Sequence, residues 1–344
     1  MIFLNKEIGP NQYPFIVAEI SCNHKGDLTE AKHIIEAAKA CGADAVKIQL
    51  YTPDDMTIPG LYIKHGPNQW AGRELYELYT RAQTNFELAE QMMIYANQVD
   101  IPCFASVFGA EGVEKLESIF CQAYKIASFE LTDLELIKKV ARTGKPVVLS
   151  TGMANINEID TATCCMKPEN YILLHCVSSY PTLLPEANLW RIQHLANHYD
   201  APVGFSDHTR GYMVGPLAVA AGAQMLEKHL MLSEKHQRQR DGRVTEDAAF
   251  SVDPDEFKTY IQRCRLAAEA MFDTPVPSEA SSLELRRSIY VTNDVKKGEA
   301  FTKENTRVIR PALGMHGHKY MYILDCKARV DIPAGTPLTK ELLA

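Results

Sequence analysis

The stretch PFIVAEISCNHKGDLTEAKHIIEAAKACGADAVKIQ (residues 14–49) sets the pattern that repeats along the first 270 or so residues. It begins with an uninterrupted apolar run (14–19) and ends with a second one (44–49). Continuous rather than alternating apolar runs are typical of strands covered on both faces, as in a parallel sheet. Between the two runs, apolar residues recur at helical spacing: Leu28, Ala31, Ile34, Ile35 and Ala38. Gly42 then indicates the end of a helix.

The same alternation of apolar run and helical stretch continues along the chain. The eight apolar runs are 14–19, 44–49, 101–106, 123–128, 146–150, 171–176, 202–206 and 223–229. Eight strands, each followed by a helix, within about 270 residues predict an α/β fold of the closed (β/α)₈ TIM-barrel type. A doubly wound open sheet is the alternative, but no G-x-G-x-x-G follows the first strand. The long connections 50–80 and 230–253 are predicted to be lids or binding loops.

A polar, proline-containing stretch interrupts this pattern after residue 272. We predict a barrel over 1–272, a linker over 273–286 and a small β-rich domain over 287–344. Within the tail, the frame D-[VI]-x-x-G-x-x-[FL]-T-K-E occurs at 294–304 and again at 331–341. This repeat predicts two similar turns, each with its threonine capping a helix start. A domain this small should need a neighbour to bury its apolar face.

Composition narrows the classes of partner and compartment. The 344 residues carry 36 Lys and Arg against 43 Asp and Glu, a net charge of −7, so we expect neither nucleic acid nor an anionic membrane as a partner. The sequence contains no signal-peptide pattern and no apolar window long enough for a membrane span. Its nine cysteines include no C-x-x-C pair and lack the dense spacing of secreted disulfide scaffolds. We therefore expect a reduced, cytoplasmic protein.

Polar residues stand at the end of every predicted strand. Because ligands bind at the carboxyl ends of barrel strands, these residues predict a pocket. In chain order they are Glu19, Lys47, Gln49, Ser106, Lys125, Ser128, Glu130, Ser150, His175, Ser178, Tyr180, Ser206, His208, Glu227 and His229. A lysine within an apolar strand is unfavourable unless its charge is paired. Lys47 and Lys125 therefore either form internal salt bridges or, together with the serines, cradle a phosphate and a carboxylate.

His208 and His229 end neighbouring strands and could converge on one cation, although a single histidine is more often a satisfied core residue. A site with two nitrogen ligands and otherwise oxygen donors suits Mn²⁺, Mg²⁺ or Co²⁺ better than structural zinc, and we expect Mn²⁺. Two protein ligands leave positions open for water or substrate, as a Lewis acid requires.

Seven segments carry a family resemblance: AEISCNHKGD (18–27), GADAVKIQ (42–49), YKIASFE (124–130), GKPVVLSTGM (144–153), LLHCVSSYP (173–181), FSDHT (205–209) and LEKH (226–229). They resemble the sialic acid synthase family, whose members condense phosphoenolpyruvate with an N-acetylated amino sugar. The tail, with its Arg310-Pro311 pair, resembles the SAF (antifreeze-like, β-clip) domain of that family. The segments at 128–130 and 185–189 look more like the pseudaminic acid synthase branch. That branch implies a 2,4-diacetamido-trideoxyhexose acceptor rather than N-acetylmannosamine.

The resemblance also implies roles for single residues. It assigns phosphoenolpyruvate binding to Lys47, Ser106, Lys125, Ser128, Ser150, Ser178, Ser206 and Arg310. Arg310 would come from the second subunit of a domain-swapped homodimer. The resemblance assigns the divalent metal to His208 and His229, the reacting centre to Glu19, Gln49, Glu130 and Tyr180, and the sugar to Asn23 and Asp247. The segment 238–247 departs from the usual family loop, and this departure bears on the sugar specificity.

Two rival functions remain open on the same fold. A Schiff-base aldolase would use Lys125 or Lys228 as its nucleophile, although we expect Lys228 to point away from the pocket toward the helices. A non-catalytic carbohydrate-binding protein would depend on the antifreeze-like tail, but polar residues at eight strand ends argue against it. Glu19 and Glu130 are both candidates for the general base, because nearby lysines keep a carboxylate ionised whereas burial protonates it.

Overall fold

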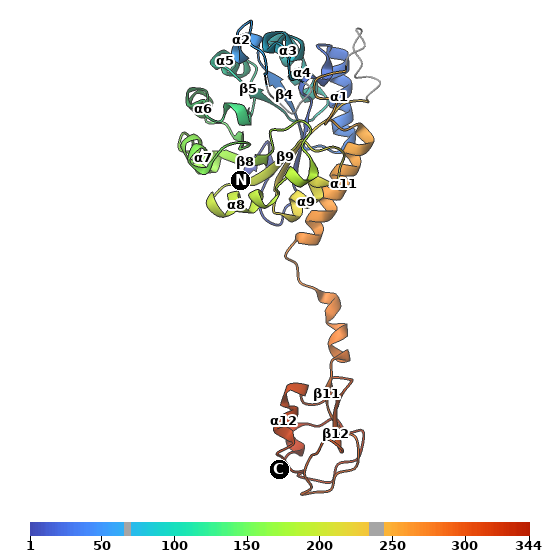
Figure 1. Ribbon diagram of the computed structural model, residues 1–344. Helices are drawn as coiled ribbons and strands as arrows, with labels where there is room; N and C mark the ends of the chain where they lie inside the picture. The colour runs from blue at the N-terminus through green and yellow to red at the C-terminus, as the bar shows by residue number, and fades with distance from the viewer. Residues whose placement is uncertain (65–69, 234–243) are drawn as a thin grey trace. The chain divides into compact units, whose positions relative to one another are not determined.

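The computed structural model describes residues 1–64, 70–233 and 244–344, in two compact units, Met1–Phe272 and Asp273–Ala344 (Figure 1). The first unit is a closed barrel of parallel strands in which β10 pairs with β3, which confirms the predicted (β/α)₈ fold. Each predicted apolar run overlaps one strand, and β4, β5 and β9 extend one residue beyond their runs. The strands are β3 (Phe15–Glu19), β4 (Ala45–Leu50), β5 (Cys103–Val107), β6 (Tyr124–Ile126), β7 (Val147–Ser150), β8 (Tyr171–Cys176), β9 (Val203–Asp207) and β10 (Met225–His229).

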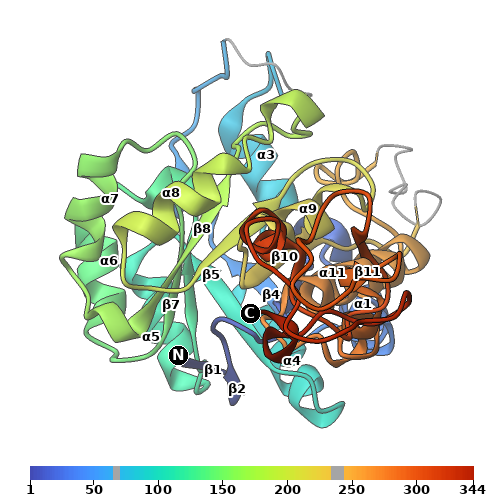
Figure 2. The ribbon, with the colours of Figure 1, turned by 90° about the horizontal axis from the view of Figure 1, so that it is seen from below.

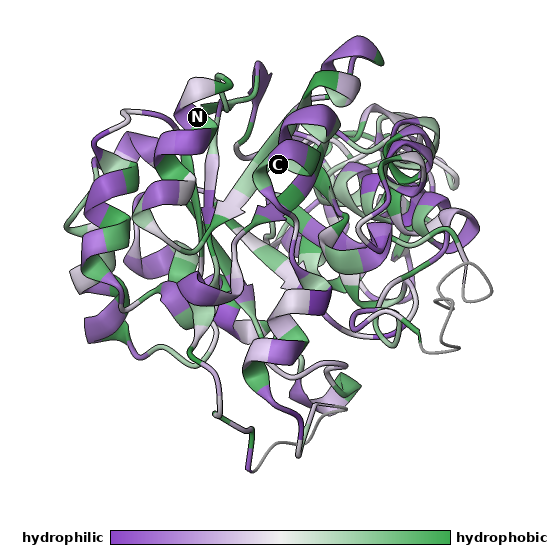
Figure 3. Ribbon diagram, turned by 90° about the horizontal axis from the view of Figure 1, so that it is seen from above, coloured by the Kyte–Doolittle hydropathy of each residue, from purple (hydrophilic) through white to green (hydrophobic). Residues whose placement is uncertain are grey.

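Helices follow the strands and form an outer layer. They include α1 (Leu28–Cys41), α4 (Phe86–Gln98), α5 (Ala110–Ser118), α6 (Leu134–Ala141), α7 (Ile156–Thr163), α8 (Trp190–His198), α9 (Val214–Ala220) and α11 (Pro254–Met271). Helices α5 to α8 lie outside the strands in Figure 2. Hydrophilic and hydrophobic residues alternate along the helices in Figure 3, as expected when one face packs on the barrel.

Local sequence explains where the first of these helices begins and ends. The side chain of Asp27 accepts a hydrogen bond from the Glu30 amide and so caps the start of α1. Gly42 ends the helix with φ of 93°, a left-handed conformation that glycine adopts without strain. The apolar residues that predicted this helix form its buried face: Ala31, Ile34, Ile35 and Ala38.

A short hairpin that the sequence did not predict fills the N-terminal end of the barrel. Strands β1 (Ile2–Phe3) and β2 (Lys6–Glu7) pair antiparallel. The fully buried ring of Phe3 packs edge-on against Phe15 and Phe104, with centroid distances of 5.2 and 5.5 Å. Because Phe15 opens strand β3, this aromatic contact closes the end of the barrel opposite the predicted site.

The two long connections lie at the carboxyl ends of the strands. The connection after β4 contains helices α2 (Pro53–Met56) and α3 (Leu75–Ala82), with a bridge between Tyr62 and Glu74. The described part of the connection after β10 returns to the barrel where Val252 pairs with Leu230. Residues 238–243 of the atypical segment lie outside the described residues.

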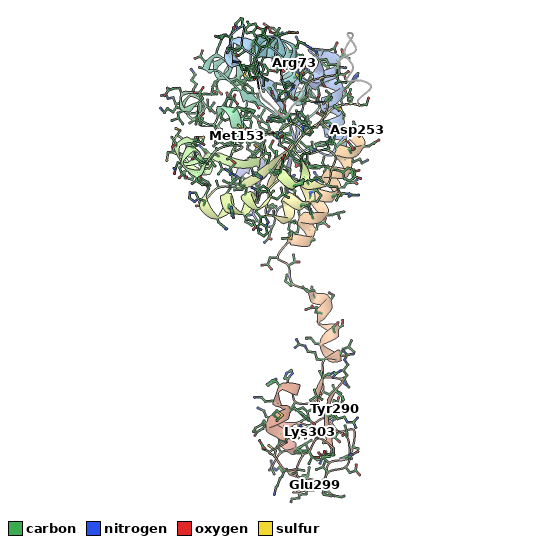
Figure 4. The ribbon with its side chains drawn as sticks, viewed as in Figure 1. Arg73, Met153, Asp253, Tyr290, Glu299 and Lys303 are labelled. Carbon is green, nitrogen blue, oxygen red and sulfur yellow. The ribbon has the colours of Figure 1, made fainter. Side chains whose placement is uncertain are left out.

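The second unit is built on β11 (Ser288–Val291) and β12 (Thr306–Ile309), which pair antiparallel, with the short helix α12 (Tyr320–Ile323). It has an apolar core of its own, formed by Ile289, Val291, Val295, Phe301, Ile323, Ala328, Ile332 and Leu338. Figure 4 shows its side chains, with Tyr290, Glu299 and Lys303 labelled. Throughout the described part of the chain, no helix is both long and apolar enough to traverse a lipid bilayer.

The sequence repeat of this unit is also a structural repeat. Val295 and Ile332 occupy equivalent positions in the two copies, and each donates its backbone N–H to the other's carbonyl, at 2.9 and 2.8 Å. The two aspartates that open the copies act reciprocally. Asp294 accepts a hydrogen bond from an amide of the second copy, and Asp331 accepts one from the first, both at 2.8 Å. The two similar turns therefore form one paired unit.

The threonines of the repeat behave differently from the prediction. Thr302 accepts a hydrogen bond from the Asn305 amide at 3.3 Å, but this cap closes a turn, because strand β12 begins at Thr306 and leaves no room for a helix. Thr339 precedes a short 3₁₀ turn (Lys340–Leu342) and its side chain caps no backbone amide there. The predicted helix start is therefore wrong in the first copy; in the second, only the predicted threonine cap is wrong, and the predicted turns are present in both.

Candidate active site

Buried lysines and glutamates form a charged cluster at the carboxyl ends of the barrel strands. Glu227 of β10 lies between two lysines, with its Oε2 atom 3.0 Å from Lys125 Nζ and 3.5 Å from Lys47 Nζ. Its Oε1 atom accepts a hydrogen bond from Ser206 Oγ at 2.9 Å, because the parallel register places Ser206 opposite Glu227. Lys47 also forms an ion pair with Glu19, its register partner on β3. The lysines therefore form the predicted internal salt bridges and also line a cavity, while their binding of a phosphate and a carboxylate stays a prediction.

The pKa values in this cluster follow from burial and mutual charge. Burial alone would lower the pKa of Lys47, but Glu19 and Glu227 raise it above the usual value. Burial lowers the pKa of Lys125, an effect that Glu227 only partly offsets. Burial would raise the pKa of Glu227, but Lys125 and Lys47 hold it well below its usual range. The cluster therefore contains two ammonium groups balanced by two carboxylates.

Two imidazoles and three aromatic rings form the wall beside this cluster. The ring centroids of His208 and His229 are 5.6 Å apart, so the two imidazoles lie side by side as predicted. Tyr180 packs on His208 at 4.5 Å, and Phe250 packs on His229 at 4.8 Å. Trp70, from the connection after β4, stacks on Tyr180 at 5.5 Å. Burial, reinforced by His229, lowers the pKa of His208 to about 3, which keeps this imidazole neutral at physiological pH.

Oxygen atoms lie close to one ring nitrogen of each imidazole. His208 Nδ1 lies 3.0 Å from the Val177 carbonyl oxygen, and only a protonated ring nitrogen can donate to a carbonyl. The Nε2 atom of the neutral ring then keeps its lone pair. Asp247 Oδ2 lies 3.3 Å from His229 Nδ1, within ion-pair distance. Over the described residues, no group of three or more His, Cys, Asp or Glu side chains could hold a metal ion.

A cavity of about 200 Å³ lies over the cluster and the imidazoles. Most of the predicted site residues line it: Lys47, Gln49, Ser106, Lys125, Ser128, Glu130, Ser150, Tyr180, Ser206, His208, His229 and Asp247. Apolar side chains from the strand-end loops also line it, and we refer to them as the apolar rim: Met56, Ile63, Leu78, Phe108 and Phe129. The cavity therefore has a polar floor and an apolar rim.

Asn23 does not lie where the sequence placed it. Its side chain is fully buried and is not part of the cavity lining. The amide nitrogen donates to the Leu230 carbonyl and to Ser251 Oγ, both at 2.9 Å, and its oxygen accepts from Thr245 Oγ1 at 2.9 Å. The 3₁₀ turn Ser21–His24 directs Asn23 away from the cavity toward this loop. Asn23 therefore fastens the loop that carries Asp247, and its predicted contact with the sugar is corrected.

Three other strand-end residues lie behind the cavity lining. Glu19 is fully buried, and its Oε1 atom accepts from the Ser21 amide at 2.7 Å while the carboxylate pairs with Lys47. Ser178 Oγ lies 2.7 Å from Ser128 Oγ and so supports a lining residue. His175 Nε2 lies 2.8 Å from the Ala187 carbonyl, also outside the lining.

Glu130 differs from Glu19 because its carboxyl reaches the cavity. Its Oε2 atom is buried and has no hydrogen-bond partner among the described residues. Burial raises the pKa of Glu130 to about 7, and Asp133 adds to the rise while Lys125 opposes it. A carboxyl that titrates near neutral pH and faces a cavity is suited to general acid–base chemistry. Of the two candidate bases, Glu130 has the geometry for the role.

Two charged contacts of the site could not be predicted from the strand ends. Glu227 was predicted to lie at the pocket, but its pairing with both lysines was not. Glu246 lines the cavity and binds Arg73 at 2.6 Å, with Arg81 at 3.7 Å. Arg73, labelled in Figure 4, belongs to the connection after β4, so this ion pair joins the two long connections. No local sequence signal predicts a pair between segments so far apart.

Two further predictions concern residues outside the cavity. Lys228 is fully buried and lies 3.3 Å from Asp207 Oδ2, away from the cavity lining, as the alternation along β10 predicts. This position removes Lys228 as the nucleophile of an aldolase. Arg310 belongs to the second unit, where it is exposed, and its contact with the barrel stays a prediction.

Comparison with known proteins places these features in a family context. Residues 34–274 match the sequence model of the NeuB family, and residues 286–344 match that of the SAF domain. A pseudaminic acid synthase of Helicobacter pylori is 40% identical over 340 residues, which cover 96% of this chain and 98% of that protein. An N,N'-diacetyllegionaminic acid synthase of Campylobacter jejuni is 33% identical over 318 residues, covering 89% and 92%. The crystal structure of an N-acetylneuraminic acid synthetase from Leptospira borgpetersenii, in complex with citrate, has a TM-score of 0.72 at 31% identity and covers 83% of this chain and 95% of that one.

Proposed function

Since the chain belongs to the NeuB family, we propose that it condenses phosphoenolpyruvate with an N-acetylated amino sugar and releases inorganic phosphate. It is an enzyme, a nonulosonic acid synthase. One observation carries the proposed chemistry: a floor of buried lysines and serines lies beside two side-by-side imidazoles in one cavity. The floor suits the phosphate and carboxylate of phosphoenolpyruvate.

The charge balance of the floor supports two further parts of the proposal. Lys47 and Lys125 are already compensated by Glu19 and Glu227. Phosphoenolpyruvate would bring about three negative charges into this buried region. Additional positive charge is therefore needed to offset its desolvation. A divalent cation at the imidazoles and the guanidinium of Arg310 would supply it.

The residues present fit a divalent metal, which we propose to be Mn²⁺, with Mg²⁺ or Co²⁺ as alternatives. His208 and His229 would hold it, and bound there it would act as a Lewis acid toward the aldehyde oxygen of the open-chain sugar. Burial keeps His208 in the neutral form that metal binding requires. Asp247 orients His229 from the side of the loop that Asn23 fastens.

The protein's own groups account for the remaining steps. Lys47, Lys125 and the floor serines hold phosphoenolpyruvate while its C3 carbon attacks the sugar aldehyde and forms the new C–C bond. Water adds to the resulting cationic C2 carbon, and Glu130 accepts the proton that this water loses. The tetrahedral intermediate then collapses to the 2-keto acid, and the C–O bond to phosphate breaks. No lysine becomes covalently attached in this scheme.

The apolar rim favours a deoxygenated acceptor. Met56, Ile63, Leu78 and Phe108 offer no hydrogen-bonding groups, so a sugar hydroxyl buried against them would lose its hydration without compensation. The methyl groups of a 2,4-diacetamido-trideoxyhexose could instead pack on this rim. We therefore propose this acceptor class rather than N-acetylmannosamine, in line with the 40% identity to a pseudaminic acid synthase.

A phosphate-release assay tests the proposal. The enzyme with Mn²⁺ and phosphoenolpyruvate is offered diacetamido-trideoxyhexoses, N-acetylmannosamine and N-acetylglucosamine. We expect phosphate release with the first group, and ¹⁸O placed in the bridging position should appear in the phosphate by ³¹P NMR. Covalent labelling by borohydride with pyruvate would instead support an aldolase at Lys125. Tight phosphoenolpyruvate binding without turnover of any sugar would support a carbohydrate-binding protein.

A domain-swapped homodimer, in which Arg310 completes the partner's site, can be tested by mixing two inactive variants. His208→Ala abolishes turnover, and Arg310→Ala raises the KM for phosphoenolpyruvate, so each variant alone is almost inactive at a phosphoenolpyruvate concentration well below that raised KM. In a swapped dimer, a mixed pair contains one site with an intact barrel and an intact arginine, so activity should return after the subunits exchange. Mixtures that stay inactive although the subunits exchange would contradict the swap.

A further inference from the structure

Behind the wall that carries the two imidazoles lies a second, separate polar cluster. Along β9 and β10, Ser206 and Glu227 face the interior of the barrel with the imidazoles. The alternate residues, Asp207 and Lys228, lie on the opposite side of the sheet and are fully buried. The parallel register places Lys228 directly opposite Asp207. The catalytic scheme above uses neither of them.

Lys228 contacts both residues that flank His208 in the chain. Its ammonium lies 3.3 Å from Asp207 Oδ2 and donates a hydrogen bond to the Thr209 carbonyl. Asp207 Oδ1 in turn accepts from the Thr209 amide at 2.9 Å and from Thr209 Oγ1 at 2.6 Å. These contacts hold the backbone of residues 207–209 in a tight turn, and His208 lies at its centre. The lysine that holds them immediately precedes His229.

The backbone holds this segment on one side only, where Thr182 donates its amide to the His208 carbonyl at 2.9 Å and pairs with Thr209. Pairing between β9 and β10 ends at Lys228 and Asp207, so His208 lies one residue beyond the last paired position. A buried ion pair generally stabilises a fold little more than apolar packing would. The position of the ion pair suggests a different role. It connects the end of β9, which precedes His208, to β10, which ends in His229.

We propose that Lys228, Asp207 and Thr209 form a clamp that sets the spacing of the two imidazoles, with Lys228 as its positioning residue. The inference rests on the proposed function, because it assumes that His208 and His229 hold a divalent cation. Loss of a group that hydrogen-bonds a metal ligand lowers metal affinity about 10- to 100-fold; the clamp acts on the imidazoles through the backbone, so we expect the lower end of this range. The phosphoenolpyruvate floor is built by other contacts, so its affinity, measured with enough Mn²⁺ to saturate each variant, should change by less than about twofold.

The test removes both charges together, since a single substitution would leave a buried unpaired charge. The double variant Asp207→Asn/Lys228→Met keeps the volume of both side chains. Thr209→Val is a milder variant that loses one hydrogen bond to Asp207. Thr163→Val is its matched control, because Thr163 is another buried threonine whose hydroxyl bonds backbone oxygens within α7.

Mn²⁺ is titrated into each full-length protein, and free Mn²⁺ is measured by electron paramagnetic resonance. Phosphoenolpyruvate binding is measured separately by calorimetry. We expect the double variant to bind Mn²⁺ at least tenfold more weakly and Thr209→Val severalfold more weakly, with Thr163→Val unchanged. If the double variant fails to fold, the Mn²⁺ affinities of Thr209→Val and Thr163→Val are compared instead, and equal affinities would refute the clamp.

Three results would overturn the inference. Wild-type Mn²⁺ affinity in folded clamp variants would refute the clamp but leave the proposed metal site intact. Parallel losses of Mn²⁺ and phosphoenolpyruvate affinity would show general loosening of the barrel instead of positioning. Absence of Mn²⁺ binding by the wild-type protein would refute the proposed metal site, and the clamp with it.

Discussion

Replacing Glu130 with glutamine should lower activity and raise stability together. The pKa of this carboxyl rises from an ordinary value of 4.5 to about 7 because it is buried. At 1.36 kcal/mol per pKa unit, the structure disfavours the ionised form by about 3 kcal/mol. A group with this pKa is about half ionised at pH 7, so it can act as a base under physiological conditions.

The kinetic signature is a dependence on pH. If Glu130 accepts the proton from water, kcat/KM should fall below pH 7, to about one tenth of its plateau at pH 6 and about one hundredth at pH 5. Glu130→Gln should lower the rate about 10²- to 10⁴-fold and remove this dependence. The assay is phosphate release from pH 5 to 9 with saturating Mn²⁺.

The stability signature has a definite sign. Between pH 4.5 and 7 the folded protein binds more protons at Glu130 than the unfolded chain does, so stability is lost as pH rises through this window. Glu130→Gln should therefore be up to about 3 kcal/mol more stable than the wild type at pH 8, with the difference vanishing below pH 4.5. Urea unfolding measures it. Glu169→Gln, on an exposed 3₁₀ turn, is the matched control and should change neither property.

Two results would refute this reasoning. A wild-type kcat/KM that is constant between pH 6 and 8 would show that no group with a pKa near 7 controls the reaction. A Glu130→Gln variant with more than about half of wild-type activity would show that Glu130 is not the base, whatever its pKa.

Three further predictions concern other parts of the molecule. His208→Ala and His229→Ala should each abolish turnover and its metal dependence without unfolding the barrel, measured by phosphate release and circular dichroism; full activity of EDTA-treated wild type would contradict the metal role. Arg310→Ala should raise the KM for phosphoenolpyruvate at least tenfold, and an unchanged KM would argue against contact between tail and barrel. Burial lowers the pKa of His24 to about 4, so the unfolded chain binds more protons here and stability is lost as pH falls from 6.5 toward 4. The loss should be about 2 kcal/mol at pH 5, and His24→Gln should show a correspondingly smaller loss in urea unfolding.

The barrel could be predicted because its strands are continuous apolar runs with a polar residue at the end. The run at 171–176 coincides with β8, and the direction of Lys228 follows from the alternation of side chains along β10. The hairpin of β1 and β2 could not be predicted, because two-residue strands carry no periodicity.

The candidate site was only partly predictable for a related reason. Strand ends reveal which residues meet at the mouth of a barrel, but not which of them pair. Glu227 meets Lys125 across 102 positions of sequence, and no local pattern contains that contact. Asn23 was misplaced because the direction of a side chain in a 3₁₀ turn depends on the loop it contacts.

The packing of Phe3 against Phe15 and Phe104 has a consequence for the order of events during turnover. Because aromatic rings close one end of the barrel, substrates and products must enter and leave through the other end. The reactant destined for the deepest position then has to arrive first, and the fragment released there has to depart last. Steady-state kinetics should accordingly be ordered, with phosphoenolpyruvate binding first. Inorganic phosphate should be a competitive inhibitor toward phosphoenolpyruvate but not toward the sugar. Excess sugar should inhibit by binding to the free enzyme before phosphoenolpyruvate does.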